Sequence, residues 1–94
     1  MSILIRFTPT KATVAQYDET IRLLEESGNW PDPDGLEYHV CFSGPGDNVR
    51  DSEIWDSAEH FQAHGEHLMP ILAEVGIELG GEPEFAEVHA ITSP

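Results

Sequence analysis

The chain has 94 residues, enough for one domain with a thin hydrophobic core. The 18 Asp and Glu residues against 4 Lys and Arg give a net charge of −14, which disfavours nucleic acids and anionic membranes because both are negatively charged. The single cysteine, Cys41, excludes an internal disulfide. The apolar run in residues 1–10 is short and interrupted by Arg6, unlike a signal peptide, so we expect one cytoplasmic domain spanning residues 1–94.

The N-terminal part of the chain predicts a strand and then a helix. Residues 2–8 (SILIRFT) are mostly apolar and partly β-branched, as in a strand. Residues 11–27 predict an amphipathic helix, with either Thr10 or Thr13 as its N-terminal cap and Gly28 at its C-terminal end. The apolar side chains of this helix recur at spacings of three and four residues: Val14, Tyr17, Ile21 and Leu24.

The middle of the chain predicts a β-hairpin. After a proline-stiffened loop at residues 29–35, which carries Trp30, residues 36–43 alternate strictly between two sides of a strand. Residues 44–47 (GPGD) form a turn, and residues 48–55 form the returning strand. One side of the first strand carries Leu36, Tyr38, Val40 and Phe42, and the other side carries Glu37, His39, Cys41 and Ser43.

The register of this hairpin depends on the length of its loop. An even loop pairs Phe42 with Val49 and Leu36 with Trp55, so that apolar side chains face one another. An odd loop would change every pairing, because side chains alternate between the two faces of a strand. We expect the even loop.

A second helix follows the hairpin at residues 56–76. Asp56 or Ser57 caps its start, and Glu59 is placed for a capping box. Pro70 has no backbone N–H and therefore predicts a kink or a break into two short helices.

A last strand at residues 84–91 completes the order β-α-β-β-α-β. This order predicts an α+β, ferredoxin-like domain, with a four-stranded antiparallel sheet and both helices on one face. The other face would then expose large apolar side chains. A homodimer that joins the two open faces would bury them.

The stretch EIWDSAEHFQAHGEHLMPIL, residues 53–72, resembles the strand-to-helix passage of the dimeric α+β barrel proteins, and among them the antibiotic biosynthesis monooxygenase-like domains. The shared pattern is a strand that ends in tryptophan, a Ser-x-Glu-x-Phe helix start and a later Leu-x-Pro-x-Leu. The resemblance implies a barrel-shaped homodimer in which Trp55 matches the tryptophan at the end of the third strand. Proteins of this kind include cofactor-independent quinone-forming oxygenases, haem-degrading oxygenases, isomerases and proteins of no known activity, so fold does not give function.

Haem binding is not expected. The haem-degrading branch has an asparagine in or just after the first strand, where this chain has Arg6, Phe7 and Thr8. That branch also has a haem-ligating histidine late in the second helical region, where this chain has Glu74 and Val75. We expect no cofactor.

Three of the five histidines, His60, His64 and His67, flank the apolar stripe of the second helix. His60 and His67 are about 10 Å apart along the helix axis, too far to share one ion, although adjacent members could chelate as a pair. Such a pair needs a third ligand from His39, Glu53 or His89, and no metal signature is complete. Metal binding, a ligand pocket and simple packing all remain open for these histidines.

The sequence predicts binding of a small, largely apolar or aromatic molecule, with a cofactor-independent oxygenase as the enzymatic version. His39 or His64 would be the base, since histidine titrates near neutral pH. The alternative is a non-enzymatic dimeric binding or structural module, and a minor one is metal-dependent chemistry. The expected pocket residues are Trp55, Tyr38, His60, His67, Trp30 and Phe61.

Overall fold

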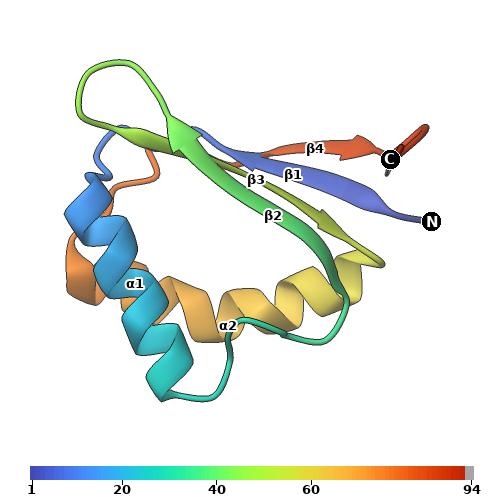
Figure 1. The fold of residues 1–94 in the computed structure, drawn as a ribbon, viewed down its shortest axis with the longest axis horizontal. Helices are drawn as coiled ribbons and strands as arrows, with labels where there is room; N and C mark the ends of the chain where they lie inside the picture. Colours follow the sequence, from blue (N-terminus) through green and yellow to red (C-terminus); the bar gives the residue numbers. More distant parts are fainter. Residues whose placement is uncertain (93–94) are drawn as a thin grey trace.

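The computed structural model describes residues 1–92, and its four strands and two helices follow one another in the predicted order (Figure 1). The strands form one antiparallel sheet in the order β2-β3-β1-β4, and both helices lie on one face of it. The ferredoxin-like α+β fold is therefore confirmed. The elements are β1 (Ile3–Phe7), α1 (Val14–Glu26), β2 (Leu36–Ser43), β3 (Val49–Trp55), α2 (Ala58–Val75) and β4 (Glu84–Glu87).

Helix α1 begins at a capping box. Thr13, one of the two predicted caps, accepts a hydrogen bond from the backbone N–H of Gln16, whose side chain accepts one from the backbone N–H of Thr13. The cap at the other end is Ser27, and Gly28 follows it in the left-handed conformation with φ of 82°. Local capping interactions therefore fix both ends of α1. The apolar stripe determines which side of the helix packs on the sheet.

Helix α2 begins at Ser57, whose side chain accepts from the backbone N–H of His60. The predicted capping box with Glu59 is wrong, because three residues beyond Ser57 stands His60. The predicted break at Pro70 is also wrong, since α2 runs continuously through it. Pro70 is exposed, and the buried leucines on either side of it, Leu68 and Leu72, pack with Leu24 of α1 and hold the helix together.

The hairpin of β2 and β3 has a register that differs from the expected one at its turn. Ser43 pairs with Val49 and Phe42 pairs with Arg50, so the loop is odd and the pairing of Phe42 with Val49 is wrong. A β-bulge between Leu36 and Tyr38 then shifts the register by one residue, and the pairing of Leu36 with Trp55 is confirmed. Because of the bulge, Leu36 and His39 both face the helices, although they are an odd number of residues apart.

The hydrophobic core lies between the sheet and the helices in two clusters. One consists of Ile5, Phe7 and Trp55 on the sheet, and the other consists of Leu24, Leu68 and Leu72 on the helices. Strand β4 ends at Glu87 rather than at residue 91, because its partner β1 begins at Ile3, opposite Glu87. Within residues 1–92, neither helix has the length and apolar character needed to cross a membrane.

The opposite face of the sheet is uncovered in the single chain (Figure 1). Alternation along the strands places the side chains of Tyr38, Val40 and Phe42 on this open face. Tyr38 is 54% exposed and Phe42 is 37% exposed, and Arg50 lies opposite Phe42. The open face therefore carries large side chains in contact with solvent, as the sequence predicts.

Candidate functional site

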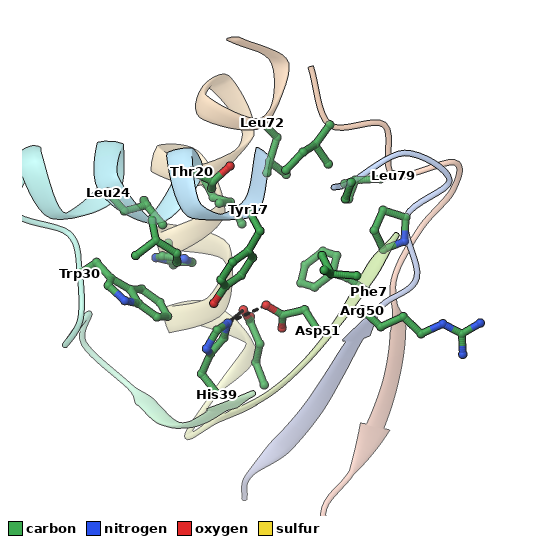
Figure 2. Close-up of a pocket in the computed structure, with 18 residues that line it drawn as sticks. Phe7, Tyr17, Thr20, Leu24, Trp30, His39, Arg50, Asp51, Leu72 and Leu79 are labelled. Carbon is green, nitrogen blue, oxygen red and sulfur yellow. Dashed lines mark hydrogen bonds and ion pairs between the residues drawn. The ribbon is translucent and has the colours of Figure 1, made fainter. Parts of the chain in front are cut away.

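A cavity of about 70 Å³ lies between the sheet and the helices (Figure 2). Most of its wall is apolar, and its polar side chains come mainly from two neighbouring strands and the two helices. The guanidinium of Arg50 points away from it. The apolar wall includes Phe7, Leu24, Trp30, Leu68, Leu72 and Leu79, and the polar part includes Tyr17, Thr20, His39, Asp51, Glu53 and His64.

The polar wall is centred on His39, Asp51 and Glu53. Nε2 of His39 lies 2.6 Å from Oδ2 of Asp51 and 3.8 Å from Oε2 of Glu53. The register produces this cluster, since Glu53 pairs with His39 and Asp51 is two residues further along the same face of β3. Figure 2 shows Tyr17 reaching from α1 toward His39 and Asp51.

Burial dominates the electrostatics of the cluster. Glu53 is 3% exposed, and its removal from water, followed by the repulsion of Asp51, raises its pKa to about 8. Burial also raises the pKa of Tyr17, with Cys41 and then Asp51 adding to the effect, and raises the pKa of the Cys41 thiol to about 11. At neutral pH the Glu53 carboxyl therefore holds a proton, and neither Tyr17 nor Cys41 is ionised.

His64 is the second histidine of the cavity wall, and it is only 4% exposed. Burial, and then repulsion by His67 and His39, lower its pKa, so its imidazole is neutral at neutral pH. Nδ1 of His64 is buried without a hydrogen-bond partner among residues 1–92. A buried nitrogen in this state is available for a hydrogen bond to a bound molecule.

Two tryptophans support these histidines. The ring of Trp30 lies 4.8 Å from that of His39 in an edge-on arrangement, and the ring of Trp55 lies 5.1 Å from that of His64. Trp55 is fully buried, and its indole N–H donates to Oε1 of Glu53 at 3.0 Å. The aromatic groups thus hold the imidazoles and one carboxyl group in fixed positions.

The structure places the remaining predicted site residues outside the cavity wall. His60 and His67 are exposed on α2, and His60 bonds Asp56 at 2.6 Å. Tyr38 lies on the open face of the sheet, and Phe61 packs against Trp55 at 5.9 Å between ring centres. His39, His64 and Trp30 are the predicted residues that line the cavity together.

Asp51 is the site residue that sequence reasoning missed. The sequence indicates Glu53 only as a third ligand for the helix histidines. With the even hairpin loop, Ser52 would stand opposite His39, and both carboxylates would face away from it. The signal was present as an Asp-x-Glu pair two residues apart on a predicted strand, but it becomes informative only with the true register.

The expected metal sets are not assembled. Among residues 1–92, the one group of three or more potential ligands that comes together is His39, Asp51 and Glu53, whose ligand atoms all lie within 4.8 Å of one another. The helix histidines do not take part in it. His39 and Glu53, which the sequence offered only as third ligands, are instead two of its three members.

The chain has the ferredoxin-like α+β fold of antibiotic biosynthesis monooxygenase-like proteins of known structure. A mutant of SnoaB, a cofactor-independent oxygenase from Streptomyces nogalater, is similar with a TM-score of 0.62 and 14% identity, over 96% of this chain and 93% of that chain. The monooxygenase ActVA-Orf6 of Streptomyces coelicolor, in complex with nanaomycin D, has a TM-score of 0.55 and 14% identity, over 99% and 90%.

NE2512 from Nitrosomonas europaea, a protein of unknown function, is equally similar, with a TM-score of 0.60 and 15% identity over 99% of this chain and 92% of that chain. No family model and no curated protein matches the chain. The resemblance inferred from residues 53–72 is therefore confirmed at the level of the fold, and activity has to be argued from the cavity.

Proposed function

We propose that the cavity binds a small, largely apolar molecule through a hydroxyl group and that His39, held by Asp51, accepts the proton of that hydroxyl. The observation that carries the proposal is the 2.6 Å contact between Nε2 of His39 and Oδ2 of Asp51 at the wall of an otherwise apolar cavity. The arrangement is that of a general base with an orienting carboxylate.

The contact with Asp51 assigns roles to the two imidazole nitrogens. With Nε2–H donating to Asp51, Nδ1 of His39 carries no hydrogen and is the nitrogen that accepts a proton. The carboxylate of Asp51 then stabilises the imidazolium that forms. The neutral His64, with its unused Nδ1, supplies a second polar contact for the bound molecule.

The size of the cavity restricts the ligand. Its volume of about 70 Å³ is well below the roughly 300–1,000 Å³ of pockets that hold drug-sized molecules. A single-ring phenol or a small enol is therefore the largest ligand class that suits the site as it stands. The apolar wall of leucines and Phe7 favours the ring, and the wall of His39 and Asp51 favours the hydroxyl.

Proton removal leads to oxygenase chemistry when the ligand is a phenol. The phenolate is electron-rich and can donate electrons to dioxygen, which becomes bonded to a ring carbon. Loss of water from this adduct gives a quinone, so one phenol and one O₂ yield one quinone and one water. SnoaB, which shares the fold, is a cofactor-independent oxygenase, and this likeness supports the enzymatic version of the proposal.

We also propose that two copies join through the open face of the sheet. Tyr38 and Phe42 are too large and too exposed to leave in water without cost, and burial of apolar surface is worth roughly 25 cal/mol per Å². The carboxylates of the cavity lie on the other face of the sheet, so the homodimer would leave the polar wall intact.

Phenol and toluene test this function, because they match in size and differ in the hydroxyl group. In the presence of a metal chelator, phenol should raise the melting temperature of the protein by mass action, whereas toluene should do so less. The ultraviolet difference spectrum of bound 2,6-difluorophenol, which is nearly the same size as phenol but acidic enough to transfer its proton to an imidazole, should show the phenolate band in the wild type and lose it in His39→Asn. His60→Asn, which changes an exposed histidine, is the matched control and should behave as the wild type.

A non-enzymatic binding module is the second candidate, favoured by the small cavity and the large exposed side chains of the open face. An oxygen electrode separates the two. Uptake of O₂ that depends on both phenol and His39 supports the oxygenase, and binding without uptake supports the module. Binding of 2,6-difluorophenol as the neutral form in both wild type and His39→Asn contradicts the role of His39 as a base.

A further inference from the structure

The cluster of His39, Asp51 and Glu53 contains two carboxyl groups and one imidazole in a place that is nearly closed to water. Side-chain exposure is 13% for His39, 17% for Asp51 and 5% for Glu53. Oδ1 of Asp51 is buried and has no hydrogen-bond partner among residues 1–92. Buried carboxylates normally have a positive partner or several hydrogen bonds, so this cluster is incomplete as it stands.

No cationic side chain completes it within the described part of the chain. Arg50 is the one Arg or Lys in the cavity wall, and Figure 2 shows its guanidinium directed away from Asp51. Burial is the largest cause of the raised pKa of Glu53, the charge of Asp51 is the next, and a hydrogen bond between the two carboxyl groups adds to them, as expected for two acids that share one proton and have no counter-charge. A proton on Glu53 is one way to reduce this repulsion, and a bound cation is the other.

A second observation, independent of the acids, points to the same place. His64 lies on α2 rather than on the strands, and it lines the same cavity. Only 4% of its surface is exposed. Its Nδ1 is buried and unpartnered among residues 1–92. A neutral imidazole with an unused nitrogen in the wall of the same cavity is a group that a transition metal can take as a ligand.

We propose that Nε2 of His39 and one carboxylate oxygen each of Asp51 and Glu53 bind a divalent transition-metal ion such as Zn²⁺, with His64 facing the remaining coordination position directly or through water. Zinc bonds of about 2.0–2.2 Å in a tetrahedral arrangement separate the ligand atoms by about 3.3 Å. The present separations from Nε2 of His39, 2.6 Å to Asp51 and 3.8 Å to Glu53, lie on either side of that value. The three ligand atoms all lie within 4.8 Å of one another, so rotation of the two acidic side chains would bring them to zinc-binding separations.

The same geometry sets the preference among metal ions. One or two imidazoles with two carboxylates suit Zn²⁺ and its first-row neighbours, whereas Mg²⁺ prefers six oxygen ligands and keeps several waters. The cavity next to the cluster exceeds the roughly 10–15 Å³ that one water needs, so a water or a ligand oxygen can take the open position. This is a site different from the helix histidines His60 and His67.

The metal site goes beyond the proposed function and competes with it for the same side chains. A cation on Nε2 of His39 leaves the imidazole hydrogen on Nδ1, so His39 can no longer accept a proton from a ligand. Zinc would therefore inhibit the proton transfer proposed above. The two proposals fail separately, because the metal test uses no phenol and the phenol test is run with a chelator.

The experiment is a calorimetric titration of the untagged, metal-free full chain with Zn²⁺ at neutral pH. We expect one Zn²⁺ per chain, with affinity lowered at least about tenfold in Asp51→Asn and in Glu53→Gln. The double variant His60→Asn, His67→Asn is the matched control for adventitious binding to the acidic surface, and its affinity should stay within about twofold of the wild type. Mg²⁺ at the same concentration should bind at least about tenfold more weakly.

Wild-type affinity in both carboxylate variants, or loss of binding in the double histidine variant, would overturn the proposal. Circular dichroism checks that each variant is folded. If a carboxylate variant does not fold, NMR of the wild type decides. Addition of Zn²⁺ should shift the imidazole signals of His39 and change the fluorescence of Trp55, which is bonded to Glu53. Shifts confined to the signals of His60, His67 or His89 would refute the site.

Discussion

Glu53 has the most unusual environment of any acidic residue described here, since a buried carboxyl group stands beside a second carboxyl group. Its indole partner, Trp55, favours the ionised form, but burial and Asp51 together outweigh that hydrogen bond and raise the pKa to about 8. In the unfolded chain the ordinary pKa is 4.5. Between these values the folded protein binds a proton that the unfolded chain has already released.

Glu53→Gln should remove this part of the pH dependence of stability. Glu53 should make the free energy of unfolding of the wild type fall as pH rises from about 4.5 to 8, because in that interval the folded state keeps a proton on Glu53 that the unfolded chain has released. Glutamine cannot ionise and can still accept the hydrogen bond from Trp55. Urea unfolding at pH 5.5, 7 and 8.5 measures the difference between the two slopes.

His60→Gln is the control for this experiment, because a hydrogen bond to Asp56 raises the pKa of His60 as well. That exposed pair should contribute only a small slope above the ordinary histidine range. Identical slopes in the wild type and in Glu53→Gln, measured in the same chelating buffer, would show that Glu53 titrates normally in the folded protein.

The connection into β2 is closely packed against helix α2 at Gly35. Gly35 has φ of 89°, and a Cβ at this position would lie 2.5 Å from Cβ of His60 and 2.6 Å from Oδ1 of Asp56. The backbone of Gly35 therefore fills the space against the first turn of α2, and its carbonyl accepts from the backbone N–H of Asp56. This contact fixes how the loop carrying Trp30 approaches the cavity.

Gly35→Ala should destabilise the protein by more than Gly28→Ala. Both glycines have positive φ, 89° and 82°, so both substitutions carry a backbone cost of about 1 kcal/mol. Only the alanine at position 35 also clashes, since a Cβ at Gly28 meets nothing within 4 Å. Denaturant unfolding should therefore show at least about 1 kcal/mol more destabilisation at position 35. Equal losses in the free energy of unfolding would mean that α2 can move at His60 and relieve the clash at little cost.

The sequence predicted the elements well, because their signals are local. The apolar spacing of α1, the alternation of β2 and the turn at residues 44–47 each depend on neighbouring residues. The break at Pro70 was wrong because tertiary packing of Leu68 and Leu72 outweighs the loss of one backbone hydrogen bond. Local patterns contain no information about that packing.

The candidate site was only partly predictable, because it is made by register. His39 and His64 were candidates from their residue type and their position beside apolar stripes. Asp51 joined them only through the odd hairpin loop, which turns the carboxylates of β3 toward the helices. The sequence GPGD does not fix the length of the loop to within one residue. That one residue decides which side chains of β2 and β3 face one another.

For the whole molecule, the main question is what covers the open face of the sheet. The chain has a net charge of −14, which keeps separate copies apart at low salt, yet Arg6 and Arg50 reduce the negative charge on this particular face. Joining two such faces would bury Tyr38 and Phe42 at little electrostatic cost. Added salt should therefore strengthen the association rather than weaken it.

Phe42→Asp should convert the proposed homodimer into a monomer. The substitution puts a charge on the open face and removes a large apolar side chain that is 37% exposed in the single chain. Met69→Asp is the matched control, because Met69 is an exposed apolar residue of α2, away from the sheet. Sedimentation at micromolar concentration should give a dimer for the wild type and Met69→Asp and a monomer for Phe42→Asp. A wild-type monomer would remove the dimer from the proposed function.

The bulge after Leu36 has a consequence for how this domain could change over generations. The bulge separates the start of β2, where Leu36 pairs with Trp55, from the part of β2 that carries His39 in the cavity wall. Loss of the single codon for Glu37 would remove the extra residue, and Leu36 and His39 would then be two residues apart on a regular strand and would both still face the helices. One deletion of three nucleotides could therefore remove the bulge while the titratable wall of the cavity and the rest of the sheet stayed as they are.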